Sequence, residues 1–171
     1  PYTTLFRSHC VPHLYLRLMP TLSGASTTDY IKKLLFPNET FPQIEKRIEE
    51  LPIGCNGLIY HPYICGERAP FKNPFATAGF FGLTATHTTL DMMRAAFEGL
   101  PYSCYDCFRL LDKKYDILYL SGGAARSATV CRMFADVLGS RCHRVEVKEL
   151  GVLGVTRLMQ VACGRAKSVA D

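Results

Sequence analysis

Long apolar segments are missing from the sequence, and no run approaches the ~20 residues that a helix needs to cross a bilayer. No basic start is followed by an apolar stretch and a small-residue cleavage site, so a secretory signal is not indicated. Lys and Arg do not form a stripe interleaved with aromatic residues, which argues against a nucleic-acid groove. We therefore expect neither a membrane nor a nucleic acid as partner, and we expect a cytoplasmic location.

What is present fits a folded globular unit. The 171 residues are 48% hydrophobic and 20% charged, which is enough apolar surface for a buried core and suits one compact domain or a piece of a larger protein. The formal net charge of +5 mildly favours anionic ligands such as nucleotides. Without a signal segment, the 8 cysteines are expected to be free thiols in a reducing compartment.

Cys104 and Cys107 form the only CxxC spacing, and no second pair follows at the spacing of a zinc ribbon. Because both fall inside a helical pattern, we interpret them as packing residues. A zinc or redox protein is the rival hypothesis, and it would require them to converge with Cys131 or Cys142 and with His143.

Two predictions concern the N-terminal and C-terminal ends of the sequence. Pro1–Ser8 reads like the translation of a widely used sequencing adapter, so the native sequence is expected to start near His9. We expect residues 9–171 to be one partial domain, cut after Lys167 as well.

The segment 22–36 is expected to be a small-residue turn that leads into a helix. Apolar spacing predicts further helices over 44–51, 93–111, 127–138 and 151–163, with Pro101 kinking or breaking the helix over 93–111. Strands are predicted over 57–60, 116–120 and 142–147, and a Gly- and Pro-rich loop over 61–78. Strands alternating with helices in the last third indicate an α/β fold with a parallel component.

The most informative turn joins the strand that ends at Leu120 to the helix that starts at Ser127. Gly122 and Gly123 allow a ligand to approach the backbone closely, and Ser127 can cap the free N–H groups of the helix. This geometry suits a nucleotide, although an ordinary strand-to-helix turn would look the same.

A second polar pair, Glu67 and Arg68, follows Gly66 in the long loop. The pair could clamp a ligand or hold the loop, and we expect the structural role because adjacent opposite charges commonly anchor turns. His87, near a helix start, is likewise expected to be structural.

Three strings in order resemble the signatures of the FGGY carbohydrate kinases, and together they cover about residues 20–163. They are Gly57-Leu58 with Gly66-Glu67-Arg68-x-Pro70; Ala78-x-Phe80-x-Gly82-Leu83 with Asp91-Met92-x-x-Ala95-Ala96-Phe97-Glu98; and Ser121 to Ser127 with Ala135 to Gly139.

This resemblance implies one ribonuclease-H-like lobe of the actin and hexokinase superfamily, with a mixed sheet flanked by helices. It implies ATP and Mg²⁺ as cofactors and a sugar or polyol as substrate. By position, Gly122, Gly123 and Ala124 would line the adenosine site, Ser127 would lie close to the base, and Gly24 and Asp29 would lie beside the phosphates and ribose.

The family's catalytic aspartate lies in an N-terminal lobe, so no catalytic residue and no metal ligand is expected in this chain. That lobe of the same protein is the expected partner, and a homodimer is left open. Departures include Tyr30 and Val130, which stand at or near positions where the family has Trp, and the absence of the usual phosphate-binding turn.

Tyr60 to Tyr63, followed by Gly66 to Phe71, is most similar to erythritol kinases and to xylulokinase-like or L-xylulose kinases. The expected reaction is ATP-dependent phosphorylation of a pentulose such as xylulose, or of erythritol, with this chain inactive alone. The alternative is a non-catalytic, nucleotide-binding member of the actin-like superfamily.

Overall fold

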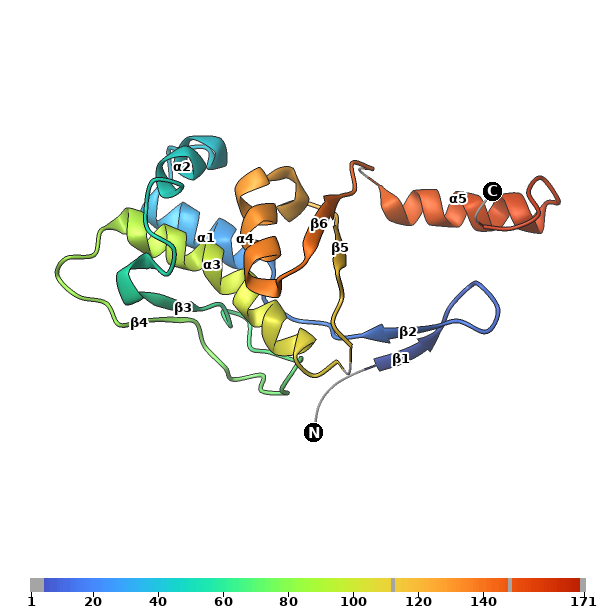
Figure 1. Cartoon of the computed structure of the whole chain (residues 1–171), viewed down its shortest axis with the longest axis horizontal. Coiled ribbons are helices and arrows are strands. Elements are labelled where there is room, and N and C mark those ends of the chain that lie inside the picture. Colours follow the sequence, from blue (N-terminus) through green and yellow to red (C-terminus); the bar gives the residue numbers. More distant parts are fainter. Residues whose placement is uncertain (1–4, 112, 148, 170–171) are drawn as a thin grey trace.

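The computed structural model describes residues 5–111, 113–147 and 149–169 (Figure 1). Of the segment thought to derive from an adapter, residues 1–4 therefore lie outside the described residues. The elements, in chain order, are β1 (Leu5–Ser8), β2 (Tyr15–Leu18), α1 (Ala25–Leu35), α2 (Phe41–Ile48), β3 (Ile59–His61), β4 (Gly79–Phe81), α3 (Thr89–Phe108), β5 (Ile117–Leu120), α4 (Ala128–Leu138), β6 (Arg141–Arg144) and α5 (Leu150–Ala162).

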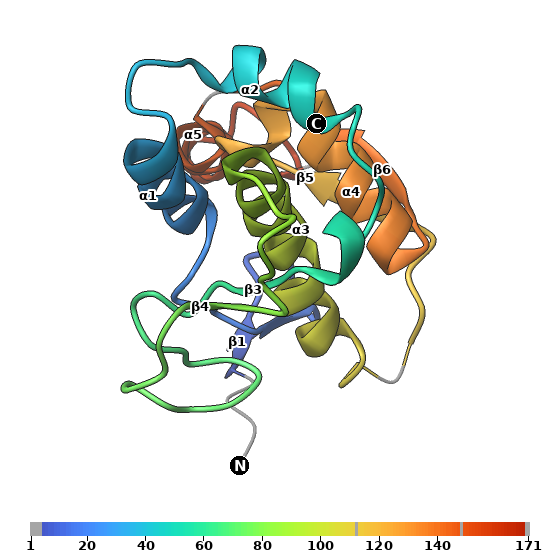
Figure 2. The ribbon, with the colours of Figure 1, turned by 90° about the vertical axis from the view of Figure 1, so that its left-hand side faces the viewer.

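Helix α3 is the centre of the fold, with α1 and α4 on either side of it and α2 across one end (Figure 2). It begins at a capping box, in which the Thr88 hydroxyl accepts from the Asp91 N–H and the Asp91 carboxylate accepts from the Thr88 N–H. Met93, Ala96 and Phe97 are buried in the core that these helices share. The predicted helix is confirmed.

Of the two effects predicted for Pro101, a kink or a break, the break is wrong, because α3 continues through Pro101 to Phe108. A proline removes one backbone hydrogen bond from the helix, which normally weakens it at that point. Here Pro101 is fully buried, and the next turn is held by Ser103, whose hydroxyl donates to the Leu100 carbonyl at 2.8 Å. Burial of the surrounding apolar face outweighs the lost bond.

The strands form three pairs in the described part of the chain. β1 pairs with β2 and β3 with β4 in antiparallel fashion, whereas β5 and β6 run parallel, with Ile117 opposite Arg141. Helix α4 connects the two parallel strands, as expected for a parallel pair that needs a crossover. The α/β class and its parallel component are confirmed. The antiparallel and parallel pairs lie in separate two-stranded sheets.

The long loop between β3 and β4 is held by Glu67, which is 1% exposed. Its Oε1 accepts from the backbone N–H of Leu22 at 2.8 Å and of Arg68 at 2.6 Å. Arg68 donates through Nε to the Pro20 carbonyl at 3.4 Å. Glu67 and Arg68 thus anchor the loop to the segment before α1, and their predicted structural role is confirmed.

Cys104 is half-buried and Cys107 is buried, as predicted for packing residues. Burial raises the pKa of the Cys104 thiol to about 11 and that of Cys107 to about 12. Within the described ranges, no three His, Cys, Asp or Glu side chains gather as metal ligands would. Cys104 and Cys107 therefore lie in the fold as small apolar residues.

Helix α5 projects from the rest of the chain beside β6, and none of its residues is buried (Figure 1). Its apolar side chains are consequently open, with Val152 at 63% and Met159 at 61% exposure. The β1–β2 pair is exposed along its whole length. In the described part of the chain, no helix is long and apolar enough to span a membrane.

Candidate functional site

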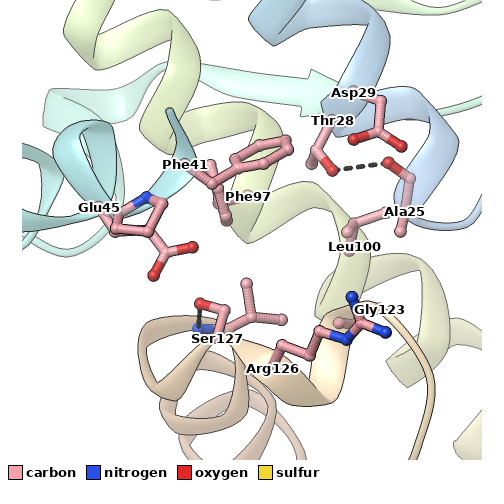
Figure 3. A pocket seen from close by; sticks show the side chains of 13 residues that line it. Ala25, Thr28, Asp29, Phe41, Glu45, Phe97, Leu100, Gly123, Arg126 and Ser127 are labelled. Atoms are coloured by element: carbon pink, nitrogen blue, oxygen red, sulfur yellow. Dashed lines mark hydrogen bonds between the residues drawn. The ribbon is translucent and has the colours of Figure 1, made fainter. Parts of the chain in front are cut away.

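A cavity of about 400 Å³ lies where α1, α2, α3 and the turn before α4 meet (Figure 3). Its lining residues are Ala25, Thr28, Asp29, Phe41, Pro42, Glu45, Phe97, Leu100, Gly123, Ala124, Arg126, Ser127 and Val130. Segments separated by about a hundred residues thus share one hollow.

The turn between β5 and α4 forms the floor of this cavity. Gly122 has φ of 77°, a left-handed conformation that favours glycine, and the chain then makes a short 3₁₀ turn over Ala124–Arg126. Ser127 caps α4 as the sequence predicts, because its hydroxyl accepts from the Val130 N–H at 3.0 Å. The turn is thereby fixed relative to the helix.

Gly123 is different from Gly122. Its φ of −60° and ψ of −43° are open to any residue, and a Cβ added there would meet nothing within 4 Å. Neither the backbone nor the packing of this chain therefore requires glycine at this position. The open space above Gly123 belongs to the cavity that the residue lines.

Helix α1 brings Thr28 and Asp29 to the opposite wall. The helix is held by Thr27, whose buried hydroxyl is 2.8 Å from the Tyr60 hydroxyl on β3. Burial raises the pKa of Tyr60, so this contact joins two neutral hydroxyls at physiological pH. Thr28 donates to the Ala25 carbonyl at 2.7 Å, which keeps its side chain against the helix.

Apolar side chains from α2, α3 and α4 form the remaining walls. Phe41 and Phe97 meet edge to face with ring centroids 5.9 Å apart, and Leu100 and Val130 lie nearby in the lining. Such walls can hold a flat aromatic ligand and exclude water from it.

The charged groups of the lining are Asp29, Glu45 and Arg126. In the described ranges, none of these three side chains forms a hydrogen bond or an ion pair with another residue. The cavity therefore offers one unpaired cation, on the turn before α4, and two unpaired carboxylates, on α1 and α2. A ligand that carries both anionic groups and hydrogen-bond donors would satisfy them.

Four of the six residues predicted from the sequence come together in this cavity: Asp29, Gly123, Ala124 and Ser127. Gly24 does not line it but immediately precedes Ala25, and it caps α1. Gly122 instead lines an adjoining hollow of about 350 Å³ that also contains Arg126 and Arg144.

The sequence did not predict that α2 lines the cavity, or that Arg126 in the turn before α4 supplies a cation to it. Phe41 and Glu45 are four residues apart and so share one helix face, a spacing that was visible in the sequence but has no chemical signature. Arg126 belongs to the Ser121 to Ser127 motif, and nothing in its neighbours in the sequence indicates that it lines the cavity.

Comparison with known proteins identifies the family. Residues 11–163 match the FGGY family of carbohydrate kinases, C-terminal domain. The chain belongs to this family. The predicted ribonuclease-H-like lobe of the actin and hexokinase superfamily is thereby confirmed.

Among the similar FGGY proteins are a xylulose kinase of Staphylococcus epidermidis, 29% identical over 165 residues, and a gluconokinase of Bacillus licheniformis, 34% identical over 160 residues. These matches cover 95% and 91% of this chain but 33% and 31% of the relatives. The chain thus spans about a third of the length of the curated relatives it matches.

The crystal structure of a ligand-bound xylulose kinase from Lactobacillus acidophilus is also similar. It superposes with a TM-score of 0.83 at 28% identity, over 91% of this chain and 32% of that chain. The expected likeness to xylulokinases is confirmed, whereas the likeness to gluconokinases was not anticipated.

Proposed function

We propose that this chain is the ATP-binding lobe of a kinase that transfers the γ-phosphoryl group of ATP to a hydroxyl of a sugar or sugar acid. The observation that supports this most is the cavity, because Asp29, Gly123, Ala124 and Ser127 converge there from two distant segments. The names of the relatives make xylulose or gluconate the first acceptors to test. Erythritol stays a prediction from the sequence.

The cavity suits an adenosine nucleotide in size and chemistry. Its volume of about 400 Å³ lies in the usual range of small-molecule sites. Phe41, Leu100 and Val130 can enclose a purine, and the space above Gly123 lets the base or ribose approach the backbone. In this arrangement the Asp29 carboxylate accepts from ribose hydroxyls.

Arg126 gives the proposed site its positive charge. Its guanidinium is exposed at the cavity and has five N–H donors that match phosphate oxygens. Gly24 at the start of α1 adds a helix N-terminus, where unpaired N–H groups favour anions. We place the phosphates on this side of the cavity, with the base toward Ser127.

Mg²⁺ would accompany the nucleotide and neutralise charge on its phosphates during transfer. In the described ranges, no cluster of three His, Cys, Asp or Glu side chains is available to hold a metal in this lobe. As the resemblance to the family implies, we assign the Mg²⁺ carboxylates, the general base and most sugar contacts to a second lobe of the same protein.

A non-catalytic nucleotide-binding protein of the actin-like superfamily would share the cavity but not the reaction. An ATP-dependent phosphorylation assay of the intact protein with xylulose, gluconate and erythritol separates the two, since only the kinase forms a sugar phosphate. We expect phosphorylation of at least one acceptor. Binding of ADP without any phosphorylation would favour the non-catalytic reading.

The isolated chain should phosphorylate none of these acceptors, because loss of base catalysis alone costs about 10²–10⁴-fold. The same assay applied to the 171 residues tests this. Robust activity of the chain alone would contradict its assignment as one lobe.

A further inference from the structure

Helix α2 brings one carboxylate to the cavity that the proposed function leaves unused. Glu45 is half-buried and lines the cavity together with Phe41, one turn earlier on the same helix. Ionised carboxylates in such positions usually find a partner, because desolvation without a hydrogen bond is costly. In the described part of the chain, the Glu45 side chain forms no hydrogen bond or ion pair with another residue.

Two other carboxylates on the same segment have partners within the chain. Glu39 forms an ion pair with Arg47, and Glu49 accepts from the Thr129 hydroxyl at 2.6 Å and from Arg132 at 2.9 Å. The Thr129 hydroxyl, with Arg132, lowers the pKa of Glu49, so this carboxylate stays ionised. Glu45 thus differs from Glu39 and Glu49 in facing the cavity.

The contacts of Glu49 also fix where Glu45 lies. They fasten the end of α2 to α4, and Glu45 stands one helical turn earlier on the same face of α2. Burial is the main cause of the raised pKa of Cys131 on α4, and the negative charge of Glu45 adds a smaller contribution in the same direction. Glu45 therefore faces the start of α4, where Ser127 caps the helix.

Figure 3 shows how the charged side chains are distributed around the cavity. The Glu45 carboxylate lies on the side of Ser127, whereas Asp29 and Arg126 lie on the other. A nucleotide that occupies the cavity with its phosphates toward Arg126 would have its base on the side of the Glu45 carboxylate.

We propose that Glu45 determines base specificity by accepting a hydrogen bond from the exocyclic amine of adenine. This inference rests on the proposed function, since it requires a nucleotide in this cavity. Adenine presents an N–H donor at C6, whereas guanine and hypoxanthine present a carbonyl oxygen there and carry their nearest donor at the ring N1–H. A carboxylate has only acceptors, so one that faces the C6 substituent accepts from adenine and repels that oxygen.

The expected preference follows from the strength of such bonds. A hydrogen bond to a charged group in a half-buried site changes an affinity by about 10-fold to 100-fold. A glutamine at this position can turn its amide and donate to the carbonyl oxygen instead. Glu45→Gln should therefore weaken ADP binding and strengthen IDP binding.

Titration calorimetry on the intact protein with ADP and IDP tests this, because the two ligands differ only in the six-membered ring of the base. The unaltered protein should bind ADP about 10-fold to 100-fold more tightly than IDP, and Glu45→Gln should reduce that ratio to within about threefold. Glu50→Gln is the matched control, since Glu50 is an exposed carboxylate that does not line the cavity, and it should leave the ratio unchanged.

The outcomes separate the two proposals. If the intact protein binds neither nucleotide, the proposed function fails. If it binds ADP and Glu45→Gln retains the full preference over IDP, or if the unaltered protein shows no preference, the role of Glu45 is refuted while the ATP site stands. A ratio that collapses equally in Glu50→Gln would mean that net charge, not the contact, sets the preference, and would also refute it.

Discussion

Gly123 gives the sharpest test of where the nucleotide binds. We expect Gly123→Val to weaken binding of ATP analogues in the intact protein while leaving sugar binding nearly unchanged. The reason is that valine would place its two methyl groups in the cavity, where the proposed ligand lies against the backbone. The sugar is held mainly by the other lobe in our proposal, so the two affinities should separate.

The size of the effect can be estimated from the fold. Gly123 has ordinary right-handed backbone angles, and a Cβ would meet nothing within 4 Å, so the folded chain itself has room for the substitution. The ligand does not, and filling an already packed site with extra methyl groups costs about 1–3 kcal/mol. That corresponds to a loss of affinity of about 5-fold to 150-fold.

Titration calorimetry with an ATP analogue and with the sugar measures both affinities. Gly154→Val on α5 is the control, because this glycine also has open space around its Cβ but lies outside the cavity. It should change neither affinity. Normal nucleotide binding by Gly123→Val would mean that the turn is only structural and that our placement of the ATP site is wrong.

Three further predictions concern the core. Arg94→Ala should lower the free energy of unfolding by about 3–5 kcal/mol in urea titrations, because Arg94 pairs with buried Glu98 at 2.7 Å and its loss leaves that charge without its cation, although the Gly54 N–H still donates to it; an unchanged midpoint would refute this. Gly99→Val should destabilise the protein by about 1–3 kcal/mol or more, since even a Cβ there would lie 2.7 Å from the Tyr60 carbonyl oxygen. Cys107, with its pKa raised to about 12, should react with iodoacetamide at neutral pH far more slowly than in urea; equal rates would contradict its burial.

The sequence predicted the elements whose signal is local. Ser127 was recognised as a cap because its side chain needs only the backbone three residues on, and its bond to the Val130 N–H confirms it. The parallel pair β5–β6 followed from a strand, helix, strand order, which leaves few topologies. The structural role predicted for Glu67 is also local in origin, since a charged pair inside a glycine- and proline-rich loop can anchor that loop.

Non-local packing set the rest. Pro101 reads as a helix breaker from its chemistry, but its complete burial in α3 depends on α1, β3 and α4, which the sequence does not place. That α2 lines the cavity could not be predicted from the sequence for the same reason. Phe41 and Glu45 reach the site because Ile44 and Ile48 bury α2 against α3, and because Glu49 fastens α2 to α4 through Thr129.

The polar groups of this lobe divide into two sets, and the division carries the functional argument. Thr27, Glu49 and Ser127 each have a defined partner within the chain, and each of these contacts fixes one wall of the cavity. Arg126 and Glu45 line the same cavity without such a partner among the described residues. Glu45 is half-buried, where an unpaired charge is costly, whereas Arg126 is exposed. A bound ligand with phosphates at one end and an amine at the other would give both side chains a partner at once. An adenine nucleotide has that distribution of groups, whereas a sugar phosphate lacks the amine and a nucleoside lacks the phosphates.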